Sequence, residues 1–197
     1  MRRQVISSWL FVAREGDRYD VSYERAPRAT NASDAMDRAE LERQLQAFHA
    51  ASFAWAMACC DRDRSDAEDV LQTVYVKVLD GKARYAGRAA FRTWLFAVIR
   101  KTATGQRRFR RLRFWPQSNR NGSSAEEEMI HSERAAALLR GLKRLARRQR
   151  EVLELVFYHD MTIEQAGETL GISLGSARVH YERGKKRLSM LLAEEER

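Results

Sequence analysis

Apolar residues recur at intervals of three and four along most of the chain, which is the spacing of an amphipathic helix. The stretch AELERQLQAFHAASFAWAMACC carries the first apolar stripe, on Leu41, Leu45, Phe48, Phe53, Trp55 and Met57. A second stripe follows in SDAEDVLQTVYVKVL. A third begins at Phe91 in FRTWLFAVIRKTATGQ and continues into the basic run RRFRRLR. The intervening DGKARYAGRAA is rich in small and polar residues and predicts a loop.

The second of these segments has a start signal and two distinct faces. Ser65, followed three residues later by Glu68, matches a capping box, so we expect a helix to begin at Ser65. One face is apolar, with Val70, Leu71, Val74, Val78 and Leu79. The opposite face is polar and partly acidic, with Asp66, Asp69, Gln72, Thr73 and Lys77.

The helical pattern is interrupted by FWPQSNRNGSSAEEE, in which proline, glycine, serine and asparagine gather. We therefore predict a flexible linker over 114–131, between one helical domain at 38–113 and a second at 132–197. Beyond the break, the spacing predicts four helical segments at roughly 130–145, 147–158, 162–170 and 173–192. The predicted fold class is all-α, with two small helical domains.

Residues 1–37 differ from everything that follows. Two β-prone runs in VISSWLFVAREGDRYDVSYE flank EGDR and predict a hairpin, after which RAPRATNASDA resembles a linker. An equally weighted interpretation is that Met36 is the natural start and the preceding residues are a disordered or unnatural extension. The opening MRRQVISSWLF imitates a signal peptide, but its apolar run is brief and lacks a small-x-small cleavage site.

Composition adds a strong positive charge to this helical pattern. The 197 residues include 36 Lys and Arg against 27 Asp and Glu, a formal net charge of +9. Such a charge favours a polyanionic partner, either nucleic acid or an acidic membrane surface. No stretch reaches the roughly 18 apolar residues of a membrane span, so we expect no membrane insertion and a cytoplasmic location.

The chain offers few residues for metal binding or catalysis. Its two cysteines, Cys59 and Cys60, are adjacent, which suits neither zinc ligation nor a disulfide between them. The four histidines are scattered, and CDRDRSDAED lacks the glycine and terminal glutamate of a calcium loop. We expect no metal, no cofactor, no small-molecule substrate and no catalytic residue.

The segment TIEQAGETLGISLGSARVHYERGKKRL predicts a helix-turn-helix. Thr162 and Gln165 form a capping box, Gly171 ends the short helix, and Ser173 is placed to cap the next one. At about 100° per residue, one side of the second helix should pack inward: Ala177, Tyr181, Gly184 and Leu188. The opposite side suits a major groove, where Arg reads guanine and lysines hold phosphates: Arg178, Val179, Glu182, Arg183 and Lys186.

Aromatic and basic residues alternate in RYAGRAAFRTWLFAVIRKTATGQRRFRRLR. This mixture suits single-stranded DNA, because bases stack on aromatic rings while phosphates pair with cations. Phe91, Trp94 and Phe96 equally suit a hydrophobic core, and for Trp94 we favour the core. Tyr85 lies in the predicted loop and is the better stacking candidate.

Three segments, DAEDVLQTVYVKVL, GRAAFRTWLFAVIRKTA and RQREVLELVFYHDMTIEQAGETLGISLGSARVHYERGKKRL, follow one another in this order. Together they resemble an extracytoplasmic-function (group IV) RNA polymerase sigma factor over about residues 40–192. The resemblance implies sigma region 2 at about 40–113 and region 4 at about 132–192. It also implies a protein that binds core polymerase, recognises −35 and −10 promoter elements, assists promoter melting and directs transcription initiation.

The resemblance further implies roles for individual residues. The acidic helix face would dock on the clamp helices of the largest polymerase subunit through Asp66, Asp69, Gln72 and Thr73. The −10 element would be held by Tyr85, Arg88, Arg100, Lys101, Arg107 and Arg108, with Tyr85 as the aromatic wall for a flipped-out base. The −35 element would face Ser176, Arg178, Val179, Glu182, Arg183 and Lys186.

Several positions depart from the family pattern. Thr73 replaces a commonly acidic residue, which implies a weaker or redistributed polymerase interface. Lys101 stands for a usual asparagine, while Val179 and His180 replace a common small-polar and basic pair. A promoter consensus therefore does not transfer to this chain.

Two other functions are alternatives to the sigma factor. A stand-alone helix-turn-helix regulator explains the C-terminal half but leaves the acidic helix face and the aromatic-basic segment without a function. A DNA enzyme needs a nucleophile or a carboxylate cluster for metal. Its best candidates are the acidic residues Asp61, Asp63, Asp66 and Asp69. This cluster is more simply explained as a turn and a helix N-terminus.

The expected partners are core polymerase and promoter DNA, and the resemblance allows for an anti-sigma factor.

Overall fold

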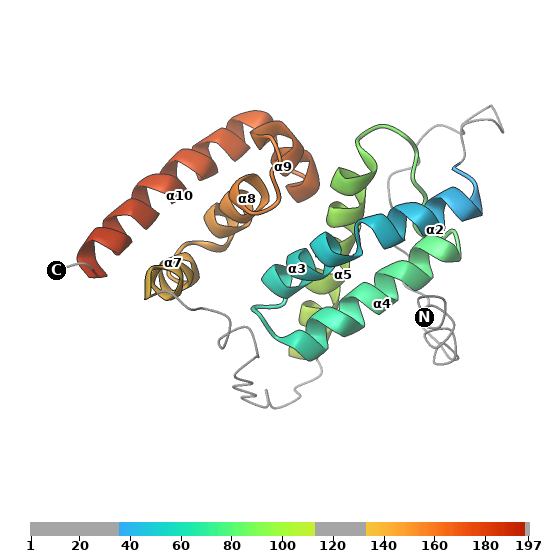
Figure 1. The fold of residues 1–197 in the computed structure, drawn as a ribbon, viewed down its shortest axis with the longest axis horizontal. Helices are drawn as coiled ribbons and strands as arrows, with labels where there is room; N and C mark the ends of the chain where they lie inside the picture. Colours follow the sequence, from blue (N-terminus) through green and yellow to red (C-terminus); the bar gives the residue numbers. More distant parts are fainter. Residues whose placement is uncertain (1–35, 113–132, 196–197) are drawn as a thin grey trace. The chain divides into compact units, whose positions relative to one another are not determined.

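Two groups of helices make up residues 36–112 and 133–195, which are the residues that the computed structural model describes (Figure 1). The first group contains α2 (Arg38–Ala47), α3 (His49–Cys59), α4 (Arg64–Leu79) and α5 (Phe91–Leu112). The second contains α7 (Glu133–Lys143), α8 (Arg147–Phe157), α9 (Ile163–Leu170) and α10 (Leu174–Glu195). These described residues form helices and no strands, which confirms the all-α prediction. The expected hairpin lies outside them.

Two helix boundaries differ from the sequence pattern. The first apolar stripe is divided at Phe48, which ends α2 and precedes α3. The predicted start of α4 at Ser65 is wrong: Asp63 is the N-cap, and its side chain accepts a 2.9 Å hydrogen bond from the backbone N–H of Asp66. Asp63 thus fills the cap role two residues earlier, and the carboxylate of Glu68 pairs instead with Arg64.

The first group packs through α3, α4 and α5, which contact one another. Trp55 and Met57 of α3, Val70 and Val74 of α4, and Phe96 of α5 are all almost completely buried. Burial of this many large apolar side chains is the main source of stability for such a bundle. The polar face of α4 therefore turns away from the core.

The second group is organised around α8 and the pair α9–α10, which all contact one another. Val152, Leu153 and Leu155 of α8 are buried, as are Ala166 of α9 and Ala177 of α10. The bounds of α7 to α10 match the four helical segments predicted from spacing. The helix-turn-helix is thus held against α8 by a small apolar core.

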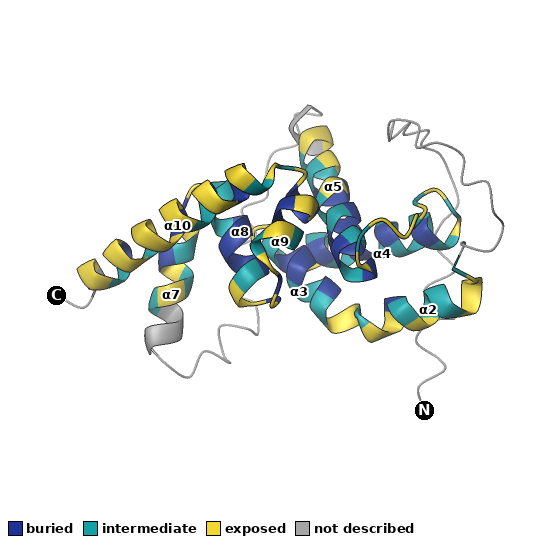
Figure 2. Ribbon diagram, turned by 90° about the horizontal axis from the view of Figure 1, so that it is seen from above, coloured by how far each residue is buried: buried dark blue, intermediate teal, exposed yellow. Residues whose placement is uncertain are grey.

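The described residues from Met36 onward form one compact unit, in which a single buried cluster includes side chains from both groups. Trp55 and Phe96 share this cluster with Val152, Leu155 and Met161. In Figure 2 the buried residues follow α3, α5, α8 and α9, whereas α2 and α10 carry long exposed stretches. Helices α8 and α9 therefore cover part of α3 and α5.

Among the described residues, no helix combines the length and apolar character needed to cross a membrane.

Candidate nucleic-acid and protein-binding surfaces

The turn between α9 and α10 is fixed by local hydrogen bonds. The backbone N–H of Gln165 donates to Oγ1 of Thr162 at 3.1 Å, and the backbone N–H of Thr162 donates to Oε1 of Gln165 at 3.0 Å. Gly171 ends α9 with φ of 64°, in the left-handed region that favours glycine. Ser173 Oγ then accepts from the backbone N–H of Ser176 at 3.2 Å, which caps α10. All three predicted caps are present.

The inner face of α10 packs closely on its neighbours. Ala177 and Gly184 are buried, and Tyr181 and Leu188 are half-buried. A Cβ atom on Gly184 would lie 3.1 Å from Cβ of Gln149 and 3.2 Å from Cδ1 of Leu153. Glycine at this position therefore allows α10 to approach α8 more closely than a side chain would permit.

The outer face of α10 is exposed, as the helix angles predicted. Val179 is 46% exposed although it is apolar. The polar members of this face are also exposed: Ser176, Arg178, Glu182, Arg183 and Lys186. Glu182 pairs with Lys185 within the helix at 3.4 Å. This surface offers two guanidiniums, an ammonium group and one carboxylate to a partner.

The polar face of α4 is only partly exposed. Asp69 is exposed, whereas Asp66, Gln72 and Thr73 are half-buried. The hydroxyl of Thr73 accepts a 3.4 Å hydrogen bond from Nε2 of Gln106, which links this face to α5. Burial lowers the pKa of Lys77 on the same helix, and repulsion from Lys101 adds a smaller decrease. Asp69 is thus the most accessible acid of the predicted polymerase-binding set.

Tyr85 belongs to an aromatic cluster at the base of the loop 80–90. Its hydroxyl donates a 2.6 Å hydrogen bond to the backbone oxygen of Ala89. Its ring centroid lies 5.3 Å from those of both Phe91 and Trp94. Tyr85 and Trp94 are half-buried, whereas Phe91 is buried. The cluster fixes the direction of the Tyr85 ring, and Arg88 in the same loop is exposed.

The basic residues of α5 differ in accessibility. Lys101 and Arg108 are exposed. The side chain of Arg107 pairs with Asp61 Oδ2 at 2.8 Å, and that of Arg100 pairs with Glu151 Oε2 of α8 at 3.3 Å. Arg100 is only 16% exposed. Two of the cations predicted to hold the −10 strand are therefore occupied by carboxylates in this structure.

Glu151 joins α8 to α5, a role that sequence analysis did not anticipate. Its carboxylate is 4% exposed and accepts from Arg147 Nε at 2.9 Å and Arg148 Nη1 at 3.2 Å, in addition to Arg100. The spacing of Arg147 and Glu151 indicates a helical ion pair. Nothing in the spacing indicates the contact with Arg100, which lies 51 residues away.

We call the surrounding polar contact the α5–α8 seam. It consists of Asp61, Arg62, Arg100, Thr104, Arg107, Arg147, Arg148, Arg150, Glu151 and Glu154. Arg62 Nη2 lies 3.2 Å from Glu154 Oε1, and Arg150 Nη2 lies 3.2 Å from Asp61 Oδ1. Burial raises the pKa of Glu154, although Arg62 opposes this shift. The seam thus ties α8 to α5 and to the turn before α4.

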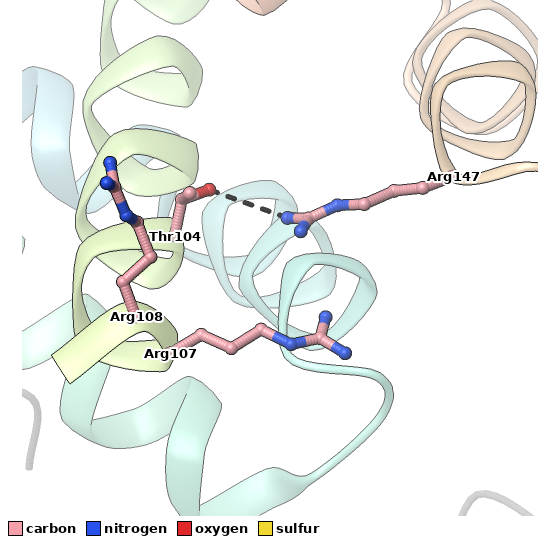
Figure 3. A pocket seen from close by; sticks show the side chains of 4 residues that line it. All are labelled: Thr104, Arg107, Arg108 and Arg147. Carbon is pink, nitrogen blue, oxygen red and sulfur yellow. Dashed lines mark hydrogen bonds between the residues drawn. The ribbon is translucent and has the colours of Figure 1, made fainter. Parts of the chain in front are cut away.

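A cavity of about 300 Å³ opens at one end of the seam, lined by Thr104, Arg107, Arg108 and Arg147. Figure 3 shows Arg147 reaching from α8 toward Thr104 on α5, where its Nη2 lies 3.5 Å from the hydroxyl oxygen. Arg107 extends from α5 toward the same side, and Arg108 runs along α5. Three guanidiniums line this opening, and two of them, on Arg107 and Arg147, are paired with the carboxylates of Asp61 and Glu151.

His159, between α8 and α9, belongs to the apolar contact between the two groups of helices. Its ring lies edge-on to Trp55 and Phe96, with centroids 5.8 and 4.9 Å away. Burial, reinforced by the nearby Arg92, lowers the pKa of His159 to about 4. The imidazole is therefore neutral near pH 7 and packs as part of the core.

The described residues contain no cluster of three or more His, Cys, Asp or Glu side chains arranged to hold a metal. Cys59 is buried, and burial raises the pKa of its thiol well above the usual value, with Glu151 adding to the shift. A thiol of this kind is a poor nucleophile. The chemistry that the described surfaces support is binding of acidic and basic partners.

These surfaces define a helical binding protein with a polar docking face, an aromatic-basic segment and a helix-turn-helix. The family model "Sigma-70 region 2" matches residues 46–113, and "Sigma-70, region 4" matches residues 135–188.

Sigma factors from several bacteria are similar to this chain in sequence and in fold. The chain is 30% identical over 154 residues to RNA polymerase sigma factor CarQ of Myxococcus xanthus, which covers 76% of this chain and 88% of CarQ. It is 28% identical over 131 residues to RNA polymerase sigma factor SigZ of Bacillus subtilis, covering 66% and 74% of the two chains. The solved structure of sigma factor RpoE with the anti-sigma factor NepR from Bartonella quintana shares the fold. Its TM-score is 0.61 and its identity 19%, and the match covers 78% of this chain and 97% of that one.

The chain belongs to the extracytoplasmic-function RNA polymerase sigma factors, which are transcription initiation factors rather than catalysts. Its function is promoter-specific transcription initiation together with RNA polymerase. The stand-alone regulator is disfavoured because region 2 is present beside the helix-turn-helix.

Proposed function

We propose that three surfaces of this chain divide the work of initiation: α4 binds core polymerase, the loop 80–90 with α5 holds the −10 strand, and α10 reads the −35 element. The observation that carries this proposal is the presence of three chemically different surfaces within the two matched sigma regions. An acidic face, an aromatic-basic segment and an exposed basic helix each suit a different partner.

On α4, Asp69 would make the principal contact with the polymerase clamp, because it is the exposed acid of its set. Asp66 and Gln72 would flank it. Thr73 would contribute little, since its hydroxyl already accepts a hydrogen bond from Gln106. A docking face with so few accessible acids favours a reversible complex, as expected for a dissociable subunit.

On the −10 side, Tyr85 would form the wall of a base pocket. Its hydrogen bond to Ala89 and its contacts with Phe91 and Trp94 hold the ring in one direction before DNA arrives. Such preorganisation lowers the entropy lost on binding. The phosphates of the strand would pair with Arg88, Arg100, Lys101, Arg107 and Arg108.

On the −35 side, α10 would enter the major groove with its exposed face. Arg178 and Arg183 would read base edges, Val179 would offer an apolar contact, and Glu182 would accept from an exposed amino group. Ser176 and Lys186 would position the helix on phosphates. This division predicts that only some substitutions on α10 alter sequence preference.

We further propose that the protein has no enzymatic activity of its own and acts in the cytoplasm, where polymerase is found. An anti-sigma factor would be its regulator. The structural match to a sigma factor held by an anti-sigma factor motivates this last point, since that relative has the same fold.

Run-off transcription with purified core polymerase and a genomic promoter library tests the proposal. We expect promoter-specific transcripts that depend on this protein. If core polymerase gains no specific initiation while the protein alone shifts duplex DNA, the stand-alone regulator would replace the sigma factor. Comparing the full chain with one that starts at Met36 shows whether the first 35 residues contribute.

A further inference from the structure

Beside the shared apolar cluster, six hydrogen bonds between described residues connect helices α8 and α9, with the turn between them, to the first group of helices. Four belong to the seam: Arg100–Glu151, Arg147–Thr104, Arg62–Glu154 and Arg150–Asp61. Two lie beyond it: Thr169 Oγ1 donates to the backbone oxygen of Thr93 at 3.5 Å, and Arg92 Nη2 to that of Asp160 at 3.4 Å. The face of α5 that carries Arg100 is thus covered by the chain itself.

The charges of the seam are unequal. Six guanidiniums, on Arg62, Arg100, Arg107, Arg147, Arg148 and Arg150, face three carboxylates, on Asp61, Glu151 and Glu154. Glu151 alone accepts from three of these guanidiniums. Arginines that converge on one small anion form the kind of arrangement that also binds phosphate.

Polar groups in the seam are incompletely satisfied. Nε of Arg100 and Oε2 of Glu154 are buried and have no hydrogen-bond partner among the described residues. A carboxylate meets Arg100 through a single oxygen at 3.3 Å, whereas a planar guanidinium can donate two parallel hydrogen bonds to a phosphate. Glu151 therefore binds Arg100 less strongly than a phosphate that accepts two hydrogen bonds would.

We propose that the Arg100 surface of α5 is a phosphate-binding site with two mutually exclusive occupants: the Glu151 carboxylate in the closed chain and a phosphate of single-stranded DNA in the open chain. This inference rests on the proposed path of the −10 strand along α5. In the closed chain Glu151 screens Arg100 from DNA. Separation of α8 from α5 releases Arg100, while Glu151 keeps Arg147 and Arg148, which lie on its own helix.

The cavity beside Thr104 fits this exchange. Arg108, on the α5 side of the cavity, is exposed while Glu151 still holds Arg100, whereas Arg107 is half-buried and paired with Asp61. A strand phosphate can therefore pair with Arg108 before the seam opens. Added salt weakens the seam pairs and the strand contacts alike, so tests should use one fixed ionic strength.

Glu151→Gln provides the direct test, because it keeps the shape of the side chain and removes its charge. We expect an increase in the radius of gyration in small-angle scattering without DNA. We also expect roughly tenfold tighter binding of a short fluorescein-labelled single-stranded DNA, measured by fluorescence anisotropy, as the competent fraction grows. Glu42→Gln is the matched control, since it removes an exposed i,i+4 ion pair with Arg38 and should change neither quantity.

Two further variants separate opening from DNA contact. Arg100→Gln should expand the chain without tightening DNA binding, because it removes the phosphate partner as well as the seam pair. Thr169→Gln should expand the chain and tighten binding, because it opens the contact with Thr93 and leaves the arginines intact. Far-UV circular dichroism verifies that each variant remains helical.

A compact Glu151→Gln chain with unchanged DNA affinity would overturn the proposal. So would expansion without any gain in affinity in both Glu151→Gln and Thr169→Gln, since DNA would then not compete for the covered surface. Small-angle scattering is done without DNA, so the two proposals can fail separately. If α5 does not bind the −10 strand, the variants expand but none of them binds single-stranded DNA. If the seam does not hold the chain closed, the radius of gyration stays unchanged.

Discussion

The indole Nε1 of Trp55 donates a 3.0 Å hydrogen bond to the backbone oxygen of Phe96, and the two rings stack with centroids 5.9 Å apart. This pair joins α3 to α5 at the centre of the buried cluster, where both residues have essentially no exposed surface. It explains why neither aromatic residue is available to stack on DNA.

Replacing Trp55 with Phe should lower the free energy of unfolding by about 1–3 kcal/mol, because a hydrogen bond is lost and a small cavity forms. Urea unfolding followed by circular dichroism measures this loss. Trp94→Phe is the control at a half-buried position on α5 and should cost less. Equal losses for the two variants would contradict a central role for Trp55.

The neutral state of His159 makes stability depend on pH. Burial lowers its pKa from an ordinary 6.5 to about 4, so the folded chain resists a proton that the unfolded chain accepts. Its contribution is present above about pH 6.5 and is lost as the pH falls toward 4. At pH 5 the loss should amount to about 1–2 kcal/mol relative to pH 7.

Thermal unfolding of the wild type and His159→Gln at pH 7 and pH 5 measures this effect. The variant should show a smaller decrease on acidification. The raised pKa of Glu154 acts in the opposite direction, because protonation stabilises a buried carboxyl, but it is common to both proteins and cancels in the comparison. Parallel pH profiles would contradict the assignment to His159.

Gly184 should be sensitive to the addition of a single methyl group. Its Cβ would press against Gln149 Cβ and Leu153, and the former is attached directly to the backbone of α8 and yields little. We expect Gly184→Ala to lower the free energy of unfolding by about 1 kcal/mol or more, despite its better helix propensity. Gly175→Ala, with open space around it on the same helix, should be neutral or slightly stabilising.

Tyr85 should contribute a stacking surface to DNA. Tyr85→Ala is expected to weaken binding of single-stranded −10 DNA by polymerase holoenzyme by about 1–3 kcal/mol, roughly tenfold or more. Tyr85→Phe keeps the ring and should retain most of the affinity. Tyr158→Ala removes a more exposed tyrosine, 72% accessible, outside the proposed path and serves as the control. An equal effect of the two alanine substitutions would argue against a specific stacking role.

Arg183 and Lys186 should differ in what they contribute to duplex binding. Arg183→Ala should relax base preference at one −35 position, at a cost of about 1–3 kcal/mol for the preferred base. Lys186→Ala should weaken all sequences similarly and reduce the salt dependence of log K by about one. Binding to a −35 sequence library at several salt concentrations distinguishes them, with exposed Lys143→Ala on α7 as the control.

Local signals determined how much could be predicted from the sequence. The capping box at Thr162, the left-handed Gly171 and the two faces of α10 follow from spacing within a few residues, and each is present in the structure. The predicted start of α4 at Ser65 is wrong because Asp63, two residues earlier, can also cap a helix and does so in the structure. Contacts such as Arg100 with Glu151 depend on how distant helices pack, and no local pattern records them.

The exposed outer face of α10 and the covered Arg100 surface of α5 imply an order of events in time. Duplex DNA can meet α10 without any rearrangement, whereas the proposed contact of a separated strand with Arg100 must wait until α8 leaves α5. A promoter would then be located first by its upstream element, and the strand-binding surface would be complete only once α8 has left α5. The sequence of steps would be built into the chain rather than imposed by the DNA.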